Sequence, residues 1–208
     1  MRNFLLLMAV FLPQGLKLGI YRRLFHWHIG KGVHIGLSFL SAGEVSLGDQ
    51  VKIGHFNIIR GVKRLTIGTG TQIGNLNQMF GASYPHWKSE LSIGEDVGLM
   101  SRHFIDVGGS VEIGDRSVFG GRDIQVWSHT RTIVRGPLSL QPSSVRIGAD
   151  VYIGARATIV SCDIAAGAIV GAGSVVTKSF PLESCRFLIA GNPATIRKRY
   201  DSAVSEDL

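Results

Sequence analysis

Histidine is the side chain whose charge changes near neutral pH, so the seven histidines are the first candidates for proton transfer. Four of them lie in an N-terminal helical segment or at recurring positions expected to face solvent: His26, His28, His34 and His55. Three stand elsewhere and could serve a reaction: His86, His103 and His129. His129 is the strongest candidate for a general base, because residues 125–132 around it interrupt a regular repeat.

Two tryptophans stand close in sequence to these histidines. Trp87 follows His86, and Trp127 precedes His129 by two residues. We expect Trp87, Trp127, His86 and His103 to wall an acceptor site, where an indole stacks on a sugar or on adenine. Packing of the surrounding loop is an equally good role for either indole.

The charge balance points to an anionic partner. Lys and Arg number 22 and Asp and Glu 15, which gives a formal net charge of +7. This excess favours a phosphorylated cofactor, a nucleic acid or a membrane surface. The run Arg197-Lys198-Arg199 and Lys178 are the cations expected to meet phosphate, with a solvated basic tail as the alternative. No basic face with interleaved aromatic residues emerges, so nucleic acid is not favoured.

The cysteines carry little functional signal. Cys162 and Cys185 are too few for a disulfide framework and suit a reducing compartment, so we expect a cytoplasmic protein. Nothing in the sequence marks either thiol for a lowered pKa.

The element that must position these side chains is a six-residue repeat. Glycine makes up 27 of the 208 residues, and a charged fraction of 18% is too low for a disordered chain. Pairs such as Ile147-Gly148 and Ile153-Gly154 recur six residues apart. A hexapeptide period is typical of a parallel β-helix, in which the aliphatic residue points into a narrow core. The glycine is expected to allow backbone angles at which a Cβ would clash.

Three hexapeptides make one triangular coil, so the repeat predicts an all-β fold of about seven coils. The expected coil starts are Ile29, Leu47, Ile67, Ile93, Ile113, Ile147 and Ile164. Two steps between them are longer than the rest, which predicts inserted loops near residues 79–90 and 125–146. In a solenoid the function resides where the repeat is interrupted.

Helical and irregular segments are expected to flank the repeat. We assign residues 1–28 to an N-terminal amphipathic helical segment, 29–180 to the β-helix, and 181–208 to a C-terminal extension and tail. Leu16, Ile20, Leu24 and Trp27 form the expected apolar stripe, with Lys17, Arg22 and Arg23 off it. This helix either covers the end of the domain or lies on an anionic membrane. A signal peptide is a weaker alternative, because no small-x-small cleavage site follows the apolar run.

The chain resembles the hexapeptide-repeat acyltransferases, and most of all the CoA-dependent O-acetyltransferases of sugars and capsule polysaccharides. Three motifs carry the resemblance: the histidine-bearing loop at residues 125–146, the run Gly-Ala-Gly-Ser-Val-Val-Thr-Lys at 171–178, and Gly-Asn-Pro-Ala at 191–194. The resemblance covers residues 29–200. It implies a left-handed β-helix, acetyl-CoA as co-substrate, and a homotrimer with sites between subunits.

The resemblance also implies roles for individual residues. Ser128-His129 matches the dipeptide that carries the family's catalytic histidine. The positions that contact the CoA arm and nucleotide correspond to Ala155, Ala172, Thr177 and Lys178, and the C-terminal cations correspond to Arg197, Lys198 and Arg199.

The expected reaction is direct attack of a hydroxyl on the thioester in a ternary complex, with His129 as general base. Asp106 or Asp123 is expected to orient the imidazole. In the coil before the loop, the family has an Asn-Phe pair followed by an acidic residue. This chain has no Asn at that position, and Asp106 lies near the acidic position but not in its register. The acceptor is therefore open. A sugar or polysaccharide precursor is preferred, and a nucleotide-sugar amine or a xenobiotic is the alternative.

Two other classes are less favoured. A zinc carbonic anhydrase on the same fold needs three converging histidines, and its two-histidine coil spacing is absent, so no metal is expected. A non-catalytic scaffold would not need the loop histidine and the Thr177-Lys178 ending. We expect no nucleic-acid partner, and peripheral contact with the inner face of a membrane is the alternative to a fully cytoplasmic location.

Overall fold

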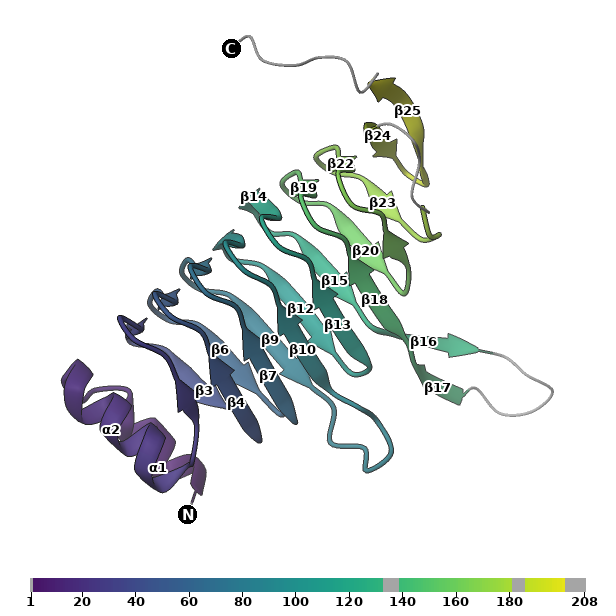
Figure 1. Ribbon diagram of the computed structural model, residues 1–208. Coiled ribbons are helices and arrows are strands. Elements are labelled where there is room, and N and C mark those ends of the chain that lie inside the picture. The colour runs from purple at the N-terminus through teal and green to yellow at the C-terminus, as the bar shows by residue number, and fades with distance from the viewer. Residues whose placement is uncertain (1, 133–138, 181–185, 201–208) are drawn as a thin grey trace, which may run out of the picture.

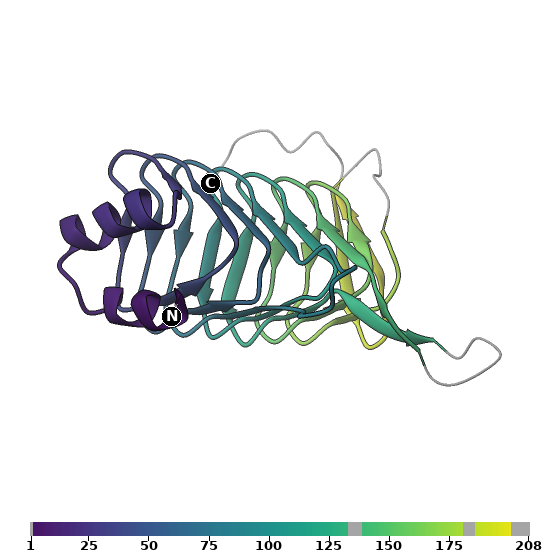
Figure 2. The same cartoon turned by 90° about the horizontal axis from the view of Figure 1, so that it is seen from below.

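The computed structural model describes residues 2–132, 139–180 and 186–200. In this part of the chain, short strands wind into a three-sided prism with two helices at its N-terminal end (Figures 1 and 2). Strands pair in parallel with the strand one turn later, so ladder hydrogen bonds run along the prism axis. The mostly β fold with parallel β-helix sheets is confirmed, while the left hand and the coil count stay predictions.

Sheet A forms one face of the prism. Its strands are, in spatial order, β1 (His28–Ile29), β4 (Glu44–Leu47), β7 (Arg64–Ile67), β10 (Glu90–Ile93), β13 (Ser110–Ile113), β18 (Ser144–Ile147) and β21 (Asp163–Ile164). Each expected coil start lies in one of these strands. The insertion before β18 leaves the register intact, because Ile113 still pairs with Ile147.

Sheets B and C form the other two faces. Sheet B contains β2 (His34–Ile35), β5 (Lys52–Ile53), β8 (Gln72–Ile73), β11 (Gly98–Ser101), β14 (Val118–Arg122), β19 (Tyr152–Ile153), β22 (Ile169–Val170), β24 (Arg186–Gly191) and β25 (Ala194–Tyr200). Sheet C contains β3 (Phe39–Ser41), β6 (Ile58–Arg60), β9 (Gln78–Gly81), β12 (Phe104–Val107), β15 (Gln125–Trp127), β20 (Thr158–Val160) and β23 (Val175–Val176).

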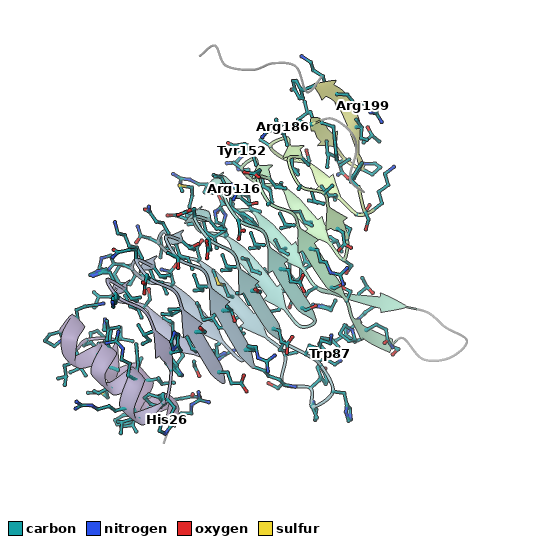
Figure 3. All side chains as sticks on the ribbon, in the orientation of Figure 1. His26, Trp87, Arg116, Tyr152, Arg186 and Arg199 are labelled. Carbon is teal, nitrogen blue, oxygen red and sulfur yellow. The ribbon has the colours of Figure 1, made fainter. Side chains whose placement is uncertain are left out.

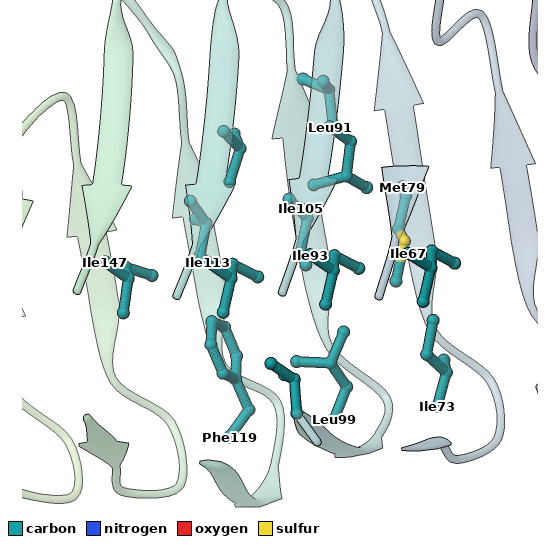
Figure 4. Packing of buried hydrophobic residues seen from close by; sticks show 14 of the residues in the cluster. Ile67, Ile73, Met79, Leu91, Ile93, Leu99, Ile105, Ile113, Phe119 and Ile147 are labelled. Atoms are coloured by element: carbon teal, nitrogen blue, oxygen red, sulfur yellow. The ribbon is translucent and has the colours of Figure 1, made fainter. Parts of the chain in front are cut away.

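Aliphatic side chains stack in columns inside the prism. In sheet A, Ile67, Ile93, Ile113 and Ile147 occupy paired positions of successive strands, and all four are buried (Figure 4). Dispersion contacts between like side chains along such a column, together with removal of their surface from water, stabilise the stack.

The glycine after each aliphatic residue is explained by close packing between coils rather than by its backbone angles. A Cβ built on Gly54 would lie 2.5 Å from the carbonyl oxygen of Gly74, in the next coil. Left-handed angles fall instead two residues later, at Gln50, Asp96 and Asp150. The expectation that the repeated glycine supplies unusual angles is therefore wrong, and steric exclusion by the neighbouring coil takes its place.

A polar ladder runs along the B–C edge, where the chain passes from sheet B to sheet C. Ser38 Oγ accepts a hydrogen bond from Asn57 N–H at 2.9 Å, and Asn57 Oδ1 accepts one from Asn77 N–H at 2.9 Å. Asn77 Oδ1 accepts from His103 N–H at 2.9 Å, and His103 Nδ1 accepts from Ile124 N–H at 3.2 Å. These side chains satisfy backbone groups inside the edge, as buried polar groups require.

The N-terminal segment forms two helices, α1 (Arg2–Ala9) and α2 (Gln14–Leu24), separated by Pro13. The expected inner stripe is wrong in part: Leu16 and Leu24 are exposed, whereas Lys17 is only 3% exposed. The Lys17 ammonium donates to the carbonyls of Ile35 and Gly36 at 3.0 and 2.9 Å. Burial lowers the pKa of Lys17. The first coil has no preceding coil to pair with, so a cation satisfies carbonyls that would otherwise be orphaned.

The C-terminal segment is more ordered than a tail. Strands β24 and β25 form an antiparallel hairpin, and β24 pairs with β22 as the next strand of sheet B. Residues 181–185 and 201–208 of the predicted extension lie outside the described residues. None of the described helices is long and apolar enough to cross a membrane.

Candidate active site

Both insertions leave the prism at the C–A edge, where the chain passes from sheet C to sheet A. The first insertion comprises residues 82–89, between β9 and β10, and the second comprises residues 128–143, between β15 and β18. Residues 125–127 belong to a coil strand, so the second insertion begins later than predicted. Parallel pairing of β12 with β15 sets Asp106 level with Trp127. The regular scaffold thereby places Asp106 directly beside the start of the second insertion.

His129 and Asp106 form a hydrogen-bonded pair at this edge. β16 (His129–Thr132) and β17 (Ser139–Pro142) form the hairpin of the second insertion, and His129 is its first residue. His129 Nδ1 lies 2.8 Å from Asp106 Oδ1. Because an ionised carboxylate only accepts hydrogen bonds, Nδ1 carries the hydrogen and Nε2 keeps its lone pair. The side chains are 27% and 16% exposed, so a substrate can reach them.

Backbone and hydroxyl donors hold Asp106 in place. Asp106 Oδ1 accepts from Gly108 N–H at 3.2 Å and from Ser128 N–H at 3.3 Å. The Ser128 hydroxyl donates to the backbone carbonyl of Asp106 at 2.8 Å, and its oxygen lies 3.2 Å from Oδ1. Ser128 is fully buried, and its oxygen accepts from Gly109 N–H at 3.0 Å. Sequence reasoning gave Ser128 no role of its own. Its position directly before His129 was the only feature of the sequence that pointed to a role in the site.

Two indoles flank the imidazole. The ring centroids of Trp87 and Trp127 each lie 6.0 Å from that of His129, and Trp127 meets it edge-on. Trp87 belongs to the first insertion and lies beside the base of the β16–β17 hairpin (Figure 3). A Cβ on Gly108 would come within 2.7 Å of the Trp87 ring, so only glycine permits this approach. The two insertions therefore meet around one histidine.

Lys63 ties the first insertion to the prism. Its ammonium donates to the backbone carbonyls of Tyr84, Pro85 and Trp87 at 3.3, 2.9 and 2.5 Å. The Tyr84 ring also packs on Trp87, with a centroid distance of 4.8 Å. Lys63 was assigned no site role from the sequence, because a lysine in a repeat position gives no sign that it reaches loop carbonyls.

Two other predicted residues, His103 and Asp123, lie away from this cluster, whereas His86 lines a hollow beside the hairpin of the second insertion. His103 is 1% exposed inside the ladder of the B–C edge and so does not wall a surface site. Asp123 lies at that same edge and pairs with Arg102 at 3.0 Å, so the structure does not bring it to His129. His86 is exposed on the first insertion and lines a hollow of about 360 Å³ that also includes Pro142, the residue opposite His129 in the hairpin.

The positions expected to contact the CoA arm lie at the B–C edge. Ala155 and Ala172 occupy successive coils there: a Cβ on Gly154 would lie 2.6 Å from Ala172 N, and Gly173 N–H donates to Ala155 O at 2.9 Å. They are thus on the opposite edge of sheet C from His129. Alanine at these positions leaves the coil backbone accessible at the edge.

The expected nucleotide contacts are exposed and lie near the C-terminal end. Thr177 and Lys178 follow β23 at the C–A edge, and the Lys178 ammonium lies 5.5 Å from the centre of the Phe180 ring. Arg197 and Lys198 lie on β25, where Arg197 donates to Ala190 O at 3.1 Å and Lys198 lies over the Tyr200 ring. The basic run is therefore part of a strand rather than of a tail.

The described residues offer no metal site of the kind that a carbonic anhydrase needs. Within residues 2–132, 139–180 and 186–200, no three His, Cys, Asp or Glu side chains are grouped to hold an ion. His103 and His129, which would be candidates for two of the three histidine ligands, lie at different edges of sheet C. Burial raises the pKa of the Cys162 thiol to about 11, which also speaks against a cysteine nucleophile there.

No family model matches this sequence. Among curated proteins, the bifunctional protein GlmU of Acinetobacter baylyi is 28% identical over 178 residues, which cover 76% of this chain and 38% of GlmU. The chain thus spans well under half the length of that relative.

Several solved acyltransferases share the fold. The N-acyltransferase AntD from Bacillus cereus, in complex with dTDP and coenzyme A, aligns with a TM-score of 0.59 at 20% identity, covering 89% of this chain and 90% of AntD. A maltose O-acetyltransferase from Clostridium difficile gives 0.51 at 16% identity, covering 97% and 86% of the two chains. The hexapeptide-repeat acetyltransferase VCA0836 from Vibrio cholerae, complexed with acetyl-coenzyme A, gives 0.51 at 19%, covering 96% and 86%. The resemblance to hexapeptide-repeat acyltransferases is confirmed at the level of the fold.

Proposed function

We propose that this chain is a CoA-dependent acyltransferase that moves an acetyl group from acetyl-CoA to a hydroxyl of a sugar or polysaccharide precursor. One observation carries the proposal: His129 Nδ1 lies 2.8 Å from Asp106 Oδ1, at an accessible edge where two loop indoles meet. A thioester is already activated, so a positioned base and two aligned substrates suffice for the transfer.

In the proposed reaction, His129 Nε2 removes the proton from the acceptor hydroxyl while the oxygen attacks the thioester carbonyl. Asp106 keeps Nε2 available as the base and stabilises the imidazolium that forms. The tetrahedral intermediate then collapses, the carbon–sulfur bond breaks, and the imidazolium returns its proton to the departing CoA sulfur. The products are the acetyl ester and CoA, and no covalent enzyme intermediate is needed.

The proposal places CoA along Ala155 and Ala172, with Thr177, Lys178, Arg197 and Lys198 at its nucleotide end. Complexes of fold neighbours with CoA and acetyl-CoA support this co-substrate. Ala155 and His129 lie at opposite edges of sheet C, which supports a homotrimer in which neighbouring copies share each site. His86, Trp87 and Trp127 would line the acceptor side.

Two finer parts of the proposal concern the coil and the compartment. We propose a left-handed prism of about seven coils, supported by the fold neighbours and by the seven strands of sheet A. A cytoplasmic location is supported by the free thiol of Cys162, which suits a reducing compartment.

The decisive experiment measures release of free CoA thiol from acetyl-CoA with a panel of sugars, oligosaccharides, nucleotide-linked amino sugars and simple alcohols. We expect turnover with a hydroxyl acceptor, and a loss on the order of 10⁴-fold in kcat for His129→Ala. Acetyl-CoA binding, measured by calorimetry, should survive in that variant. His34→Ala is the matched control, because His34 is exposed on sheet B, away from the C–A edge.

The other outcomes separate the competing readings. Turnover with amino sugars alone would replace the proposed reaction by N-acetylation on the same scaffold. Near-wild-type turnover of His129→Ala would remove His129 from the mechanism. Absence of both acetyl-CoA binding and thiol release would favour a non-catalytic scaffold.

A further inference from the structure

The N-terminal helices have two apolar faces, and only one of them packs on the prism. On α1, Leu6 and Ala9 are buried against the core. The outward side chains of α1 are Phe4, Leu5, Leu7 and Met8, and Phe11 follows in the turn after the helix; all five are exposed. Phe4 and Phe11 are 64% and 72% exposed. Large apolar side chains seldom gather on the surface of a soluble protein unless something covers them.

Helix α2, at the same end of the prism, carries further exposed apolar side chains (Figures 1 and 2). Leu16 and Leu24 are exposed, and they line a hollow of about 680 Å³ together with Arg22 and Arg23. Gly15 and Gly19 also line the hollow, and no atom lies within 4 Å of a Cβ built on either glycine. The surface therefore combines apolar ridges with an open hollow that has cations at its rim. We call it the helical face, defined by Phe4, Leu7, Met8, Phe11, Leu16, Arg23 and Leu24.

The N-terminal segment that carries the helical face has charged side chains of one sign only. Residues 2–43 include five cations and no Asp or Glu: Arg2, Lys17, Arg22, Arg23 and Lys31. The Arg22 guanidinium donates to the carbonyls of Ile29 and Gly30 at 2.9 and 3.0 Å, while Arg23 is exposed on α2. A partner that complements this surface must offer both apolar depth and negative charge.

We propose that the helical face is a membrane-docking surface that inserts its apolar side chains between lipids of an anionic bilayer. Phe4, Phe11, Leu16 and Leu24 would enter the boundary between headgroups and acyl chains, while Arg23 meets lipid phosphate. The helices lie at one end of the prism, away from the β16–β17 hairpin, so a docked prism leaves the C–A edge in water (Figures 1 and 2). The proposal does not depend on the proposed acetyl transfer.

The experiment is vesicle flotation with the full chain. Two vesicle types are used, phosphatidylcholine alone and an equimolar mixture of phosphatidylcholine and phosphatidylglycerol. We expect the protein to float with the anionic vesicles, and binding to fall as salt is raised. The double variant Phe4→Ser with Phe11→Ser should bind about tenfold or more weakly, because two inserted rings are lost. Arg23→Gln should weaken binding about fivefold.

The matched control removes similar apolar surface elsewhere. Phe56 and Leu76 are exposed at prism corners in left-handed backbone conformations, which asparagine tolerates. Phe56→Asn with Leu76→Asn should float like the unaltered chain, and circular dichroism checks that all variants fold.

Four results would overturn the proposal. The unaltered chain could fail to float with anionic vesicles, or bind both vesicle types equally. The Phe4 and Phe11 double variant could bind as well as the control. Finally, the unaltered chain could fail to bind vesicles while the double variant has a lower molecular mass than the unaltered chain by light scattering. The helical face would then be an interface between copies of this chain.

Discussion

The two edges of sheet C each hold a histidine in a hydrogen-bonded array, but the arrays differ in what lies beyond the histidine. At the B–C edge, the ladder through Asn57 and Asn77 ends on His103, which is buried and whose Nε2 has no partner among the described atoms. At the C–A edge, Asp106 and Ser128 lead to His129, which remains accessible. A histidine facing the interior supports the coil, whereas one beside an insertion can meet a substrate.

The difference has a direct electrostatic consequence. Burial lowers the pKa of His103 to about 4, so this imidazole stays neutral at any physiological pH. The imidazole of His129 instead shares a hydrogen bond with the Asp106 carboxylate and is partly exposed. One residue type thus serves structure at one edge and has the environment for chemistry at the other.

After the loss expected for His129→Ala, the largest effect should come from removing the carboxylate charge at the C–A edge. Asp106→Asn keeps the size of the side chain, but the amide no longer stabilises an imidazolium and can donate to Nδ1, which places the proton on the wrong nitrogen. We expect kcat in the thiol-release assay to fall on the order of 10³-fold while acetyl-CoA binding is unchanged.

Asp123→Asn is the control from the opposite edge. Asp123 pairs with Arg102 at the surface, and such a pair contributes little to stability, so turnover should stay near that of the unaltered chain. Equal losses in the two variants would break the distinction between the edges.

The next effect concerns stability in acid. The pKa of His103 is about 4 in the folded chain and near its ordinary value of 6.5 when unfolded. As pH falls from about 6.5 to 4, the unfolded state binds a proton that the folded state refuses, so the free energy of unfolding decreases by about 3 kcal/mol. His103→Asn extends the Asn57–Asn77 ladder without a titrating group. Between pH 7 and pH 4, the free energy of unfolding of the variant, measured with urea, should fall by about 3 kcal/mol less than that of the unaltered chain.

His34→Asn provides the comparison for this measurement, since His34 is exposed and should leave the acid sensitivity unchanged. If His103→Asn is as acid-sensitive as the unaltered chain, the buried imidazole does not limit stability, and the proposed contrast between the edges fails. The acetylation assay is independent of this result, because His103 does not reach the C–A edge.

The repeat made the scaffold predictable because each hexapeptide has the same local geometry. Every expected coil start, from Ile29 to Ile164, lies in a strand of sheet A. His129 and Asp106 were both candidates, but only parallel pairing of β12 with β15 distinguishes Asp106 from Asp123. The two aspartates lie at opposite edges of sheet C, and the edge at which a residue lies depends on the number of residues in each corner of the coil.

Residues that act through the irregular parts of the chain were harder to foresee. The apolar run of the N-terminal segment was evident from the sequence, but the face of α2 that packs on the prism was predicted wrongly. Lys17 lies on that face because its ammonium donates to carbonyls of the first coil, which no earlier coil covers. Likewise, a basic C-terminal run gave no sign that it would form a strand of sheet B. Long-range contacts, rather than local spacing, fix such features.

The smallest effect tests whether the first insertion must be held in place for the C–A edge to work. Lys63 donates to three loop carbonyls, including that of Trp87, so Lys63→Met keeps a long side chain but releases the anchor. We expect the KM for the acceptor to rise about tenfold, with kcat and the KM for acetyl-CoA little changed, because Trp87 would still be present but less well placed. Lys52→Met, at an exposed position of β5, is the control. A tenfold fall in kcat, measured with both substrates saturating, would instead show that Lys63 supports the His129–Asp106 pair itself. An unchanged KM for the acceptor would show that the first insertion holds Trp87 without this anchor.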